Sequence, residues 1–390
     1  MQAVTLAIGS GAAQVLAAVL YILTARSMQP VDYGLIVAAM ALGGVGAAVV
    51  DFGSSTYWVR ELASGRVTQQ QLNPKMSTRL LVASVVSALV IVVAAFTKPH
   101  FIVTGVLMFS TTTAGMMIVP LRAARRAELV GLLTVLDRMI SVIVFFGLSA
   151  LGCKLGLALW ISIALGDLFL ILYLSISERS QVRLSPRTLS NPWSGAKWYS
   201  LTTLSGSAQQ LDLPILTVSA GASAAGIYGG VNRWTQPLVL ATSSFVSAAA
   251  PFLAGASDLR AVRSQVLRAS WMLITVIVLS VGVIFAAPWL VTFLLGDAYA
   301  SSTAVLQWLA GAMILNSIAQ PLLVALLSRQ FDHLAAVILF ASVGVQLAIV
   351  ATLGPTLGAL SAGIGVFTSQ ALQLVGSAGS IAAIVWRRRS

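Results

Sequence analysis

Charged residues are scarce in this chain of 390 residues: Asp, Glu, Lys and Arg together make up only 9% of it. A typical soluble domain contains about 25% charged residues. Apolar residues instead reach 58%, and the mean hydropathy is +0.94. This composition excludes an ordinary soluble domain and predicts that most of the chain lies in lipid.

The side chains that build most catalytic and metal centres are also rare. The sequence has one cysteine, Cys153, and two isolated histidines, His100 and His333. One cysteine cannot form an intrachain disulfide, and neither histidine belongs to a metal-binding or Ser-His pattern. No GxxxxGK[ST] phosphate loop is present, so no ATP-driven motor is indicated. We therefore predict no catalytic residue, no metal and no cofactor.

Long apolar segments alternate with short polar breaks along the whole chain. A membrane-spanning helix needs about 20 apolar residues, and spans in hydrocarbon must be helical because strand edges would leave backbone groups unpaired. The sequence predicts twelve helical spans, at 2–25, 33–50, 80–96, 101–119, 129–153, 156–176, 201–220, 226–248, 269–295, 304–327, 334–353 and 357–385. The first has no basic segment before it and leads into another span, so we expect it to be a span and not a cleaved export signal.

Basic residues follow a clear topological pattern. Most of the 23 Lys and Arg lie in even-numbered loops or in the C-terminal tail. Cytoplasmic loops of membrane proteins carry this excess, so both termini are predicted to be cytoplasmic. Placing the basic residues beside anionic lipid accounts for the net charge of +12 without nucleic acid. The basic loop and tail residues are Arg60, Arg66, Lys75, Arg79, Arg122, Arg125, Arg126, Arg179, Arg183, Arg187, Lys197, Arg260, Arg263, Arg268, Arg329 and Arg387 to Arg389.

The two halves of the chain resemble one another when the sequence is shifted by 195 residues. This predicts two six-helix lobes in the same membrane orientation, related by a pseudo-twofold axis along the membrane normal. The expected domains are an N-lobe at 1–176, a cytoplasmic linker at 177–200 and a C-lobe at 201–390. The shift superposes Ser10, Gly11, Ala13, Gln14, Leu16, Ala25, Tyr33 and Gly34 on Ser205, Gly206, Ala208, Gln209, Leu211, Ala220, Tyr228 and Gly229.

Five ionisable residues fall inside predicted spans: Asp137, Arg138, Asp167, Asp212 and Arg233. Charge at membrane depth costs at least about 2.5–3.5 kcal/mol, so such residues normally face a cavity or a partner and are functional candidates. A structural ion pair, or a position near the interface, is the alternative for each. The set contains three acids and two bases, so one acid is in surplus. We expect Asp212, Asp167 or Asp137 to exchange a proton or bind sodium.

The seventh and eighth spans each combine a proline with polar side chains. Gln209 and Asp212 share a helix face just before Pro214, and Asn232 precedes Pro237. Proline removes a helical hydrogen bond, and broken helices at membrane depth often mark substrate sites. Gln14 is the weaker counterpart in the first half. The predicted cavity residues are therefore Arg233, Asp212, Asn232, Gln209, Gln14 and Arg138.

Several landmarks in the chain resemble a known family. Residues 25–34 (ARSMQPVDYG), 50–55 (VDFGSS) and 59–63 (VRELA) are similar to the start of the polysaccharide transporter branch, the Wzx-like O-antigen flippases, of the multidrug/oligosaccharidyl-lipid/polysaccharide (MOP) exporter superfamily. Residues 210–216 (QLDLPIL), 226–233 (GIYGGVNR) and 294–299 (LLGDAY) extend the resemblance into the second half.

The resemblance implies an all-α polytopic membrane protein with two lobes around a central cavity. It also implies transport of an undecaprenyl-pyrophosphate-linked oligosaccharide across the bacterial inner membrane, with polysaccharide polymerase and assembly proteins as partners. On that template Gln14, Asp212, Asn232 and Arg233 face the cavity. Two alternatives stay open. One is a cation-coupled exporter of small molecules from the same superfamily, and the other is a membrane-embedded glycan polymerase or ligase.

Overall fold

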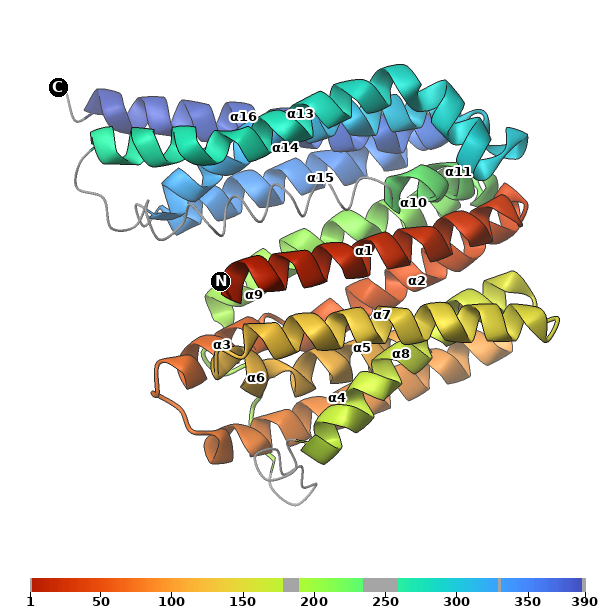
Figure 1. Ribbon diagram of the computed structural model, residues 1–390, viewed down its shortest axis with the longest axis horizontal. Coiled ribbons are helices and arrows are strands. Elements are labelled where there is room, and N and C mark those ends of the chain that lie inside the picture. Colours follow the sequence, from red (N-terminus) through yellow and green to blue (C-terminus); the bar gives the residue numbers. More distant parts are fainter. Residues whose placement is uncertain (1, 178–188, 234–258, 329–330, 388–390) are drawn as a thin grey trace. The chain divides into compact units, whose positions relative to one another are not determined.

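The computed structural model describes residues 2–177, 189–233, 259–328 and 331–387. The described residues are almost entirely helical and contain no strand (Figure 1). Nine of the described helices are long and apolar enough to cross a membrane, and they correspond to predicted spans two to six and nine to twelve. The prediction of an all-α polytopic membrane protein is thereby confirmed.

The chain divides into two compact units. Unit 1 comprises residues 1–28 and 32–214, and unit 2 comprises residues 29–31 and 215–390. The helices up to the boundary are α1 (Gln2–Arg26), α2 (Pro30–Asp51), α3 (Ser54–Ala63), α4 (Gln69–Thr97), η1 (Pro99–Phe101), α5 (Ile102–Met117), α6 (Val119–Ala123), α7 (Ala127–Ala150), α8 (Leu155–Ser177), α9 (Lys197–Ala208), η2 (Gln209–Leu211) and α10 (Asp212–Ala220). Those that follow are α11 (Ala222–Asn232), α13 (Leu259–Leu295), η4 (Asp297–Tyr299), α14 (Ser302–Ser328), α15 (Asp332–Leu357) and α16 (Ala359–Arg387).

Local sequence explains where several helices begin and end. Thr68 and Gln71 form a capping box that starts α4 eleven residues before the predicted span. Gly152, with φ of 78°, adopts the left-handed conformation after α7, so this helix ends before the predicted Cys153. The structure also contains α3, within a segment that the hydropathy pattern predicts to be a loop.

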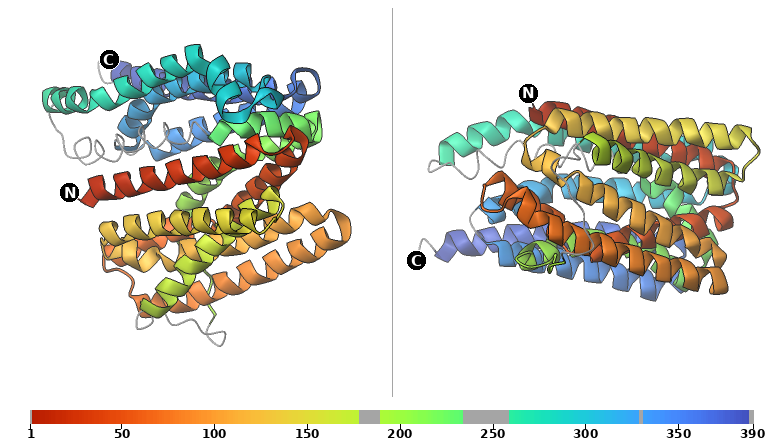
Figure 2. Two further views of the ribbon diagram at one scale, coloured as in Figure 1. Left: turned by 45° about the vertical axis from the view of Figure 1, so that its right-hand side comes forward. Right: turned by 90° about the horizontal axis from the view of Figure 1, so that it is seen from below.

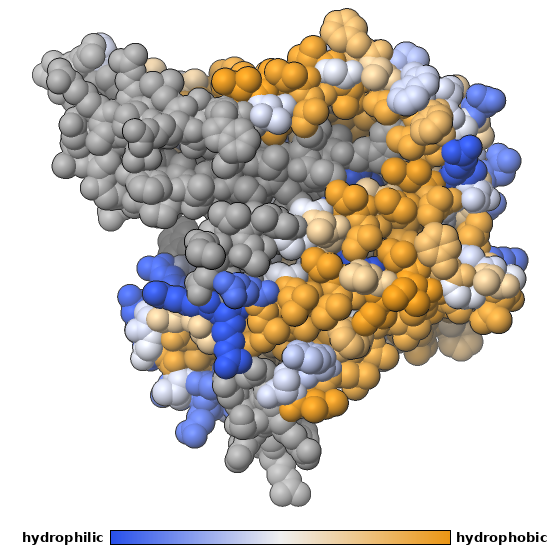
Figure 3. All heavy atoms as spheres, in the orientation of Figure 1, coloured by the Kyte–Doolittle hydropathy of each residue, from blue (hydrophilic) through white to orange (hydrophobic). Residues whose placement is uncertain are grey.

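Unit 1 is a layered bundle whose helices pack in a defined order. α1 lies beside α7, α7 packs on α8, α8 packs on α5, and α5 packs on α4 (Figures 1 and 2). Figure 3 shows hydrophobic side chains gathered over the middle of this unit and hydrophilic ones at the end where α3 and α6 lie. Leu132, Ile143 and Leu172 are among the exposed apolar residues of this unit. A broad apolar exterior on helices of this length is the surface expected to face lipid.

Unit 2 is built around α14 and α16, which pack on one another and on α15; α13 covers α14, and α11 contacts both α14 and α16. Two of the family landmarks meet here. A methyl group at Gly226 of α11 would lie 1.8 Å from the carbonyl oxygen of Pro30, so only glycine fits. Tyr228, which the predicted repeat pairs with Tyr33 of unit 1, is completely buried, as is Tyr33.

Candidate functional site

Two apolar clusters in the described part of unit 1 are separated along the helices. One contains Leu107 of α5, Phe145 of α7 and Ile163 of α8, together with residues of α1 and α2. The other contains residues of α3 to α8, among them Leu133 and Leu170. The intervening segments of α5, α7 and α8 carry polar residues instead: Ser110, Thr111, Asp137, Arg138, Ser141 and Asp167. We call this set the N-unit polar layer.

Asp167 connects two helices of the N-unit polar layer. Its side chain lies on α8 and is 5% exposed. Its Oδ2 accepts hydrogen bonds from Ser110 Oγ at 2.7 Å and Thr111 Oγ1 at 3.1 Å, both on α5. Two hydroxyl donors to one carboxylate oxygen fix the orientation of the carboxylate.

Asp137 and Arg138 form the second part of the layer. Arg138 Nε lies 3.4 Å from Asp137 Oδ2, while Asp137 Oδ1 is buried and accepts no hydrogen bond from the described residues. A methyl group at Gly166 would lie 2.3 Å from that Oδ1, so the backbone of α8 packs directly against the carboxylate. The layer thus holds two buried acids and one partly exposed guanidinium, and one buried carboxylate oxygen lacks a hydrogen-bond donor among the described residues.

Gln14 lies at the depth of this layer. Its helix, α1, packs beside α7, and a methyl group at Gly9 would lie 3.0 Å from the Cα atom of Gly131. Leu20 of α1 and Phe145 of α7 belong to the same apolar cluster, so the two helices run in the same direction. Because both rise about 1.5 Å per residue, Gln14 is level with Leu136 and hence with the neighbouring Asp137 and Arg138. Two predicted cavity residues, Gln14 and Arg138, are therefore brought to one depth.

The predicted seventh span is interrupted. α9 gives way to the 3-10 turn η2 at Gln209–Leu211, and α10 begins at Asp212, two residues before Pro214. Asp212 is 3% exposed, and Gln209 is half-buried. A methyl group at Gly44 of α2 would lie 3.0 Å from Gln210 Oε1, which places this turn against α2 within unit 1. The interruption lies at the polar cluster that the sequence analysis singled out.

Asn232 and Arg233 stand at the C-terminal end of α11, and both are half-buried. They belong to unit 2, whereas Gln209 and Asp212 belong to unit 1. A cavity shared by these four residues stays a prediction. The predicted break at Pro237 lies outside the described residues. Among the residues that the structure describes, no group of three His, Cys, Asp or Glu side chains could hold a metal ion.

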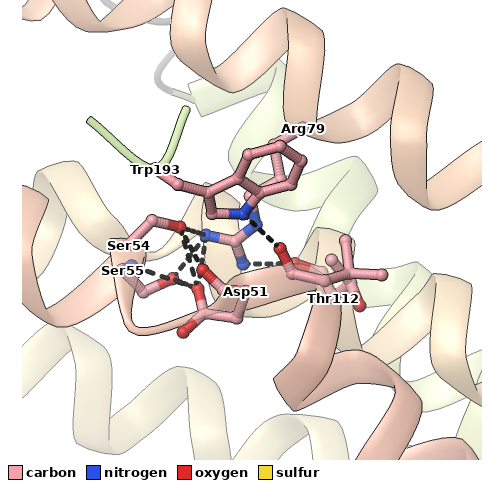
Figure 4. A network of polar contacts seen from close by, with 7 residues as sticks. Asp51, Ser54, Ser55, Arg79, Thr112 and Trp193 are labelled. Carbon is pink, nitrogen blue, oxygen red and sulfur yellow. Dashed lines mark hydrogen bonds and ion pairs between the residues drawn. The ribbon is translucent and has the colours of Figure 1, made fainter. Parts of the chain in front are cut away.

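The structure contains one buried ionic network that the sequence analysis missed (Figure 4). Arg79 was counted as a basic loop residue, but it lies inside α4 and is 1% exposed. Its Nη1 is 2.6 Å from Asp51 Oδ1 and donates to Ser54 Oγ and Ser55 Oγ at 3.0 and 2.7 Å. The VDFGSS landmark is thus the acceptor set for a buried arginine. Its signal in the sequence was the arginine directly before the apolar run at 80–96.

α5 joins this network to the N-unit polar layer. Arg79 Nη2 donates to the carbonyl oxygen of Thr112 at 3.3 Å, while the side chain of the preceding Thr111 binds Asp167. The Arg79 guanidinium also lies 5.3 Å from the centre of the Trp58 indole ring, within range of a cation-π interaction. Consecutive residues of α5, Thr111 and Thr112, therefore contact the buried Asp167 and Arg79.

The segment after residue 188 docks on the same end of unit 1. Trp193 Nε1 donates to the carbonyl oxygen of Val50 at 3.0 Å, and Lys75 Nζ donates to Ser194 Oγ at 2.8 Å. Arg60 donates to Tyr199 Oη, and this hydrogen bond raises the pKa of the Arg60 guanidinium. Part of the predicted linker is therefore a fixed element of unit 1.

Comparison with solved structures identifies the fold. The lipid II flippase MurJ, in an inward closed conformation, is 11% identical with a TM-score of 0.74, covering 97% of this chain and 87% of that one. An inward-facing multidrug resistance MATE family transporter of the MOP superfamily is 15% identical with a TM-score of 0.60, covering 98% and 95%. A MOP superfamily transporter from Pyrococcus furiosus is 14% identical with a TM-score of 0.56, covering 98% and 95%.

No protein-family model and no curated protein matches the chain. The structural neighbours are transporters and flippases, and the chain has the fold of the MOP superfamily. The expected superfamily fold is thereby confirmed, while the Wzx-like branch stays a prediction.

Proposed function

We propose that the protein is a flippase that moves a lipid-linked oligosaccharide from the cytoplasmic to the outer leaflet of a bacterial inner membrane. The observation that carries this proposal is the TM-score of 0.74 with a lipid II flippase, against 0.60 and 0.56 with two other MOP superfamily transporters. The ordered landmarks at 25–34, 50–63 and 226–233 favour the polysaccharide branch. Both termini are proposed to be cytoplasmic, because the basic loops are even-numbered.

The chemistry of the candidate residues suits such a substrate. A pyrophosphate-linked glycan presents phosphate oxygens and sugar hydroxyls. Arg138 can bind phosphate with two parallel hydrogen bonds, and Gln14 at the same depth offers an amide that pairs with hydroxyl groups. Arg138 is partly exposed although it lies in a long apolar helix, which is the property expected of a contact residue rather than a closed ion pair. Arg233, Asn232, Gln209 and Asp212 complete the proposed set.

The second candidate function is a cation-coupled exporter of small molecules. Its support is the pair of buried carboxylates, Asp137 and Asp167, with only Arg138 to balance them inside the N-unit polar layer. A surplus acid in a dry interior favours uptake of a proton or a monovalent cation. The same pair also serves a flippase driven by an ion gradient, so coupling itself does not separate the two functions. We propose no enzymatic activity and no cofactor.

Complementation separates the two functions. Wild-type protein is expressed in a bacterium that lacks its own flippase for a surface polysaccharide, and lipid-linked glycan is measured on each leaflet. We expect outer-leaflet glycan with the wild type and at least a tenfold loss with Arg138→Ala, since a lost charged hydrogen bond costs about 1.5–3 kcal/mol. Arg66→Ala, at an exposed arginine of the same unit, is the control. If cells accumulate glycan only on the inner leaflet yet become resistant to cationic drugs, the exporter is the correct function.

A further inference from the structure

Unit 2 contains a cluster of neutral polar side chains buried between its three central helices. Asn316 and Ser317 lie on α14, Ser342 on α15, and Gln370 and Gln373 on α16. All five are buried, with Gln373 2% exposed. Amide and hydroxyl groups in such an interior are costly unless every hydrogen-bonding atom has a partner. We call these five residues the C-unit polar layer.

Helix packing brings the residues of α14 and α16 to one depth. A methyl group at Gly311 of α14 would lie 3.3 Å from the Phe367 ring of α16. A methyl group at Gly363 of α16 would lie 3.2 Å from Trp308 Cβ of α14. Both contacts pair a residue of α14 with one about 56 positions later, so the helices run in the same direction with a constant offset. The same offset places Ser317 level with Gln373.

The packing of α15 places Ser342 at this depth too. A methyl group at Gly365 would lie 3.0 Å from the carbonyl oxygen of Gln346, and one at Gly376 would lie 3.2 Å from Ile338. These two contacts run in opposite order along the helices, so α15 is antiparallel to α16. Ser342 is midway between Ile338 and Gln346, which places it level with Gln370.

Two side chains of the layer have hydrogen-bonding atoms without partners among the described residues. Gln370 Oε1 is a buried acceptor with no donor, and Gln373 Nε2 is a buried donor with no acceptor. By contrast, Ser317 and Ser342 donate to Met313 and Ile338 carbonyl oxygens one turn earlier and keep free lone pairs. An unmade buried hydrogen bond costs about 1–3 kcal/mol, so native proteins rarely leave one.

We propose that the C-unit polar layer is a site for bound water inside unit 2. Water supplies both missing partners, because its oxygen accepts from Gln373 Nε2 and its hydrogens donate to Gln370 Oε1 and to the serine hydroxyls. A cation cannot accept a hydrogen bond from Gln373. The described parts of α13 to α16 also contain no carboxylate within their spans to balance a cation, since Asp332 stands at the first residue of α15.

The layer has a counterpart at equivalent helices of the other unit. The N-unit polar layer uses α5, α7 and α8, which are predicted spans four to six, and the C-unit layer uses predicted spans ten to twelve. The first contains ionisable side chains, whereas the second contains only neutral ones. The two halves of the predicted repeat thus place polar groups on corresponding helices, with ionisable side chains in the N-unit polar layer and neutral ones in the C-unit polar layer.

Hydroxyl-radical labelling of the full-length protein in nanodiscs tests the proposal, because a pulse of X-rays generates radicals from bound water. Met313 lies one turn before Ser317 and is buried away from bulk solvent. If water occupies the C-unit polar layer, we expect rapid oxidation of this side chain. Met76, which is buried in an apolar cluster of unit 1, is the matched control and should remain unmodified. Oxidation of Met313 no faster than that of Met76 would show a dry layer and overturn the proposal.

Thermal stability gives a second, independent test. If water satisfies the amides, Gln373→Leu removes a partner from the network and lowers Tm; if the amides are unsatisfied, the same change raises Tm. Val375→Leu on the exposed face of α16 is the control. If Gln373→Leu does not fold, Gln370→Met is used in its place. A raised Tm contradicts the proposal. The Tm of the wild type is also measured in sodium and in choline salts. If sodium raises the Tm of the wild type but not that of Gln373→Leu, the layer binds a cation, and the water proposal is contradicted.

Discussion

Arg79 Nη1 lies 2.6 Å from Asp51 Oδ1 in the interior of unit 1. The same carboxylate oxygen accepts hydrogen bonds from the backbone amide and the hydroxyl of Ser55, at 3.1 and 2.6 Å. The pair joins the end of α2 to the first turn of α3 and to the interior of α4. It therefore determines how the chain turns at the end of the second span.

We predict that Arg79→Ala lowers the free energy of unfolding by about 3–5 kcal/mol, because removing one partner leaves the other charge buried without compensation. Asp51→Asn should have an effect of similar size, and the double variant should be less destabilised than the sum of the two single variants. Thermal and denaturant unfolding in one detergent measures all three.

Arg66 provides the control for this prediction. It forms an ion pair with Glu61 at 3.4 Å, but its side chain is 62% exposed. An exposed pair contributes about 0–1 kcal/mol, so Arg66→Ala should leave stability nearly unchanged. Equal effects of Arg79→Ala and Arg66→Ala would contradict the view that burial gives the Arg79 pair its importance.

Hydropathy predicted most of the described helices from the sequence. Nine predicted spans appear as helical segments in the described residues, because lipid leaves a segment of that length and composition no other structure. The pattern could not reveal α3, whose ten residues include only a short apolar face. It also misplaced Arg79, because an arginine at the edge of an apolar run is read as loop when its buried partner, Asp51, is distant in sequence.

Gly53 allows the docking of the linker to be tested separately. Its φ is 72°, and a methyl group there would lie 2.4 Å from the carbonyl carbon of Tyr199. Gly65 has φ of 70° but no atom within 4 Å. Both Gly→Ala variants therefore bear the same conformational cost of about 1–2 kcal/mol, but only Gly53→Ala should displace the segment around Trp193.

Trp193 fluorescence and proteolysis of the linker measure that displacement. We expect faster cleavage near Trp193 and a red-shifted emission in Gly53→Ala, with Gly65→Ala like the wild type. Identical cleavage rates in the two variants would mean that the linker does not depend on this contact.

Gly226 is predicted to tolerate no side chain. The methyl group of Gly226→Ala would collide with the Pro30 carbonyl, a backbone atom that cannot rotate away, so we expect a loss of about 1–3 kcal/mol. Gly282→Ala in α13 meets no atom within 4 Å and should instead be neutral or stabilising by up to about 1 kcal/mol. Thermal unfolding of the two variants in parallel tests the difference, and equal Tm values would refute the close approach.

Asp167 is predicted to take part in ion coupling. If it binds the coupling ion, Asp167→Asn abolishes the stimulation of transport by a proton or sodium gradient, and typical couplings of about 1–3 kcal/mol correspond to roughly 5- to 150-fold. Transport by inverted vesicles, measured with and without each gradient, provides the readout. Asp32→Asn, at an exposed carboxylate in the first turn of α2, should keep the stimulation. A gradient response retained in Asp167→Asn assigns that acid a structural role.

The candidate site was only partly predictable. Intramembrane charge pointed to Asp137, Arg138 and Asp167 because their cost in lipid demands a reason. Their partners, Ser110 and Thr111, are common helix-packing residues, and only the packing of α5 against α8 shows which carboxylate they serve. The sequence does not indicate the buried amides of α16 for a related reason, since a neutral glutamine in an apolar helix has no charge whose cost in lipid would require a partner.

Flipping in a purified system tests the central claim most directly. The protein is reconstituted in liposomes with a fluorescent lipid-linked oligosaccharide, and a membrane-impermeant reagent reports how much label stays protected in the inner leaflet over time. We predict that wild-type protein equilibrates the label between leaflets and that Arg138→Ala slows this at least tenfold, with Arg66→Ala unimpaired. If the fraction of protected label is the same in liposomes with wild-type protein and in empty liposomes, with either a proton or a sodium gradient imposed, the protein is not a flippase.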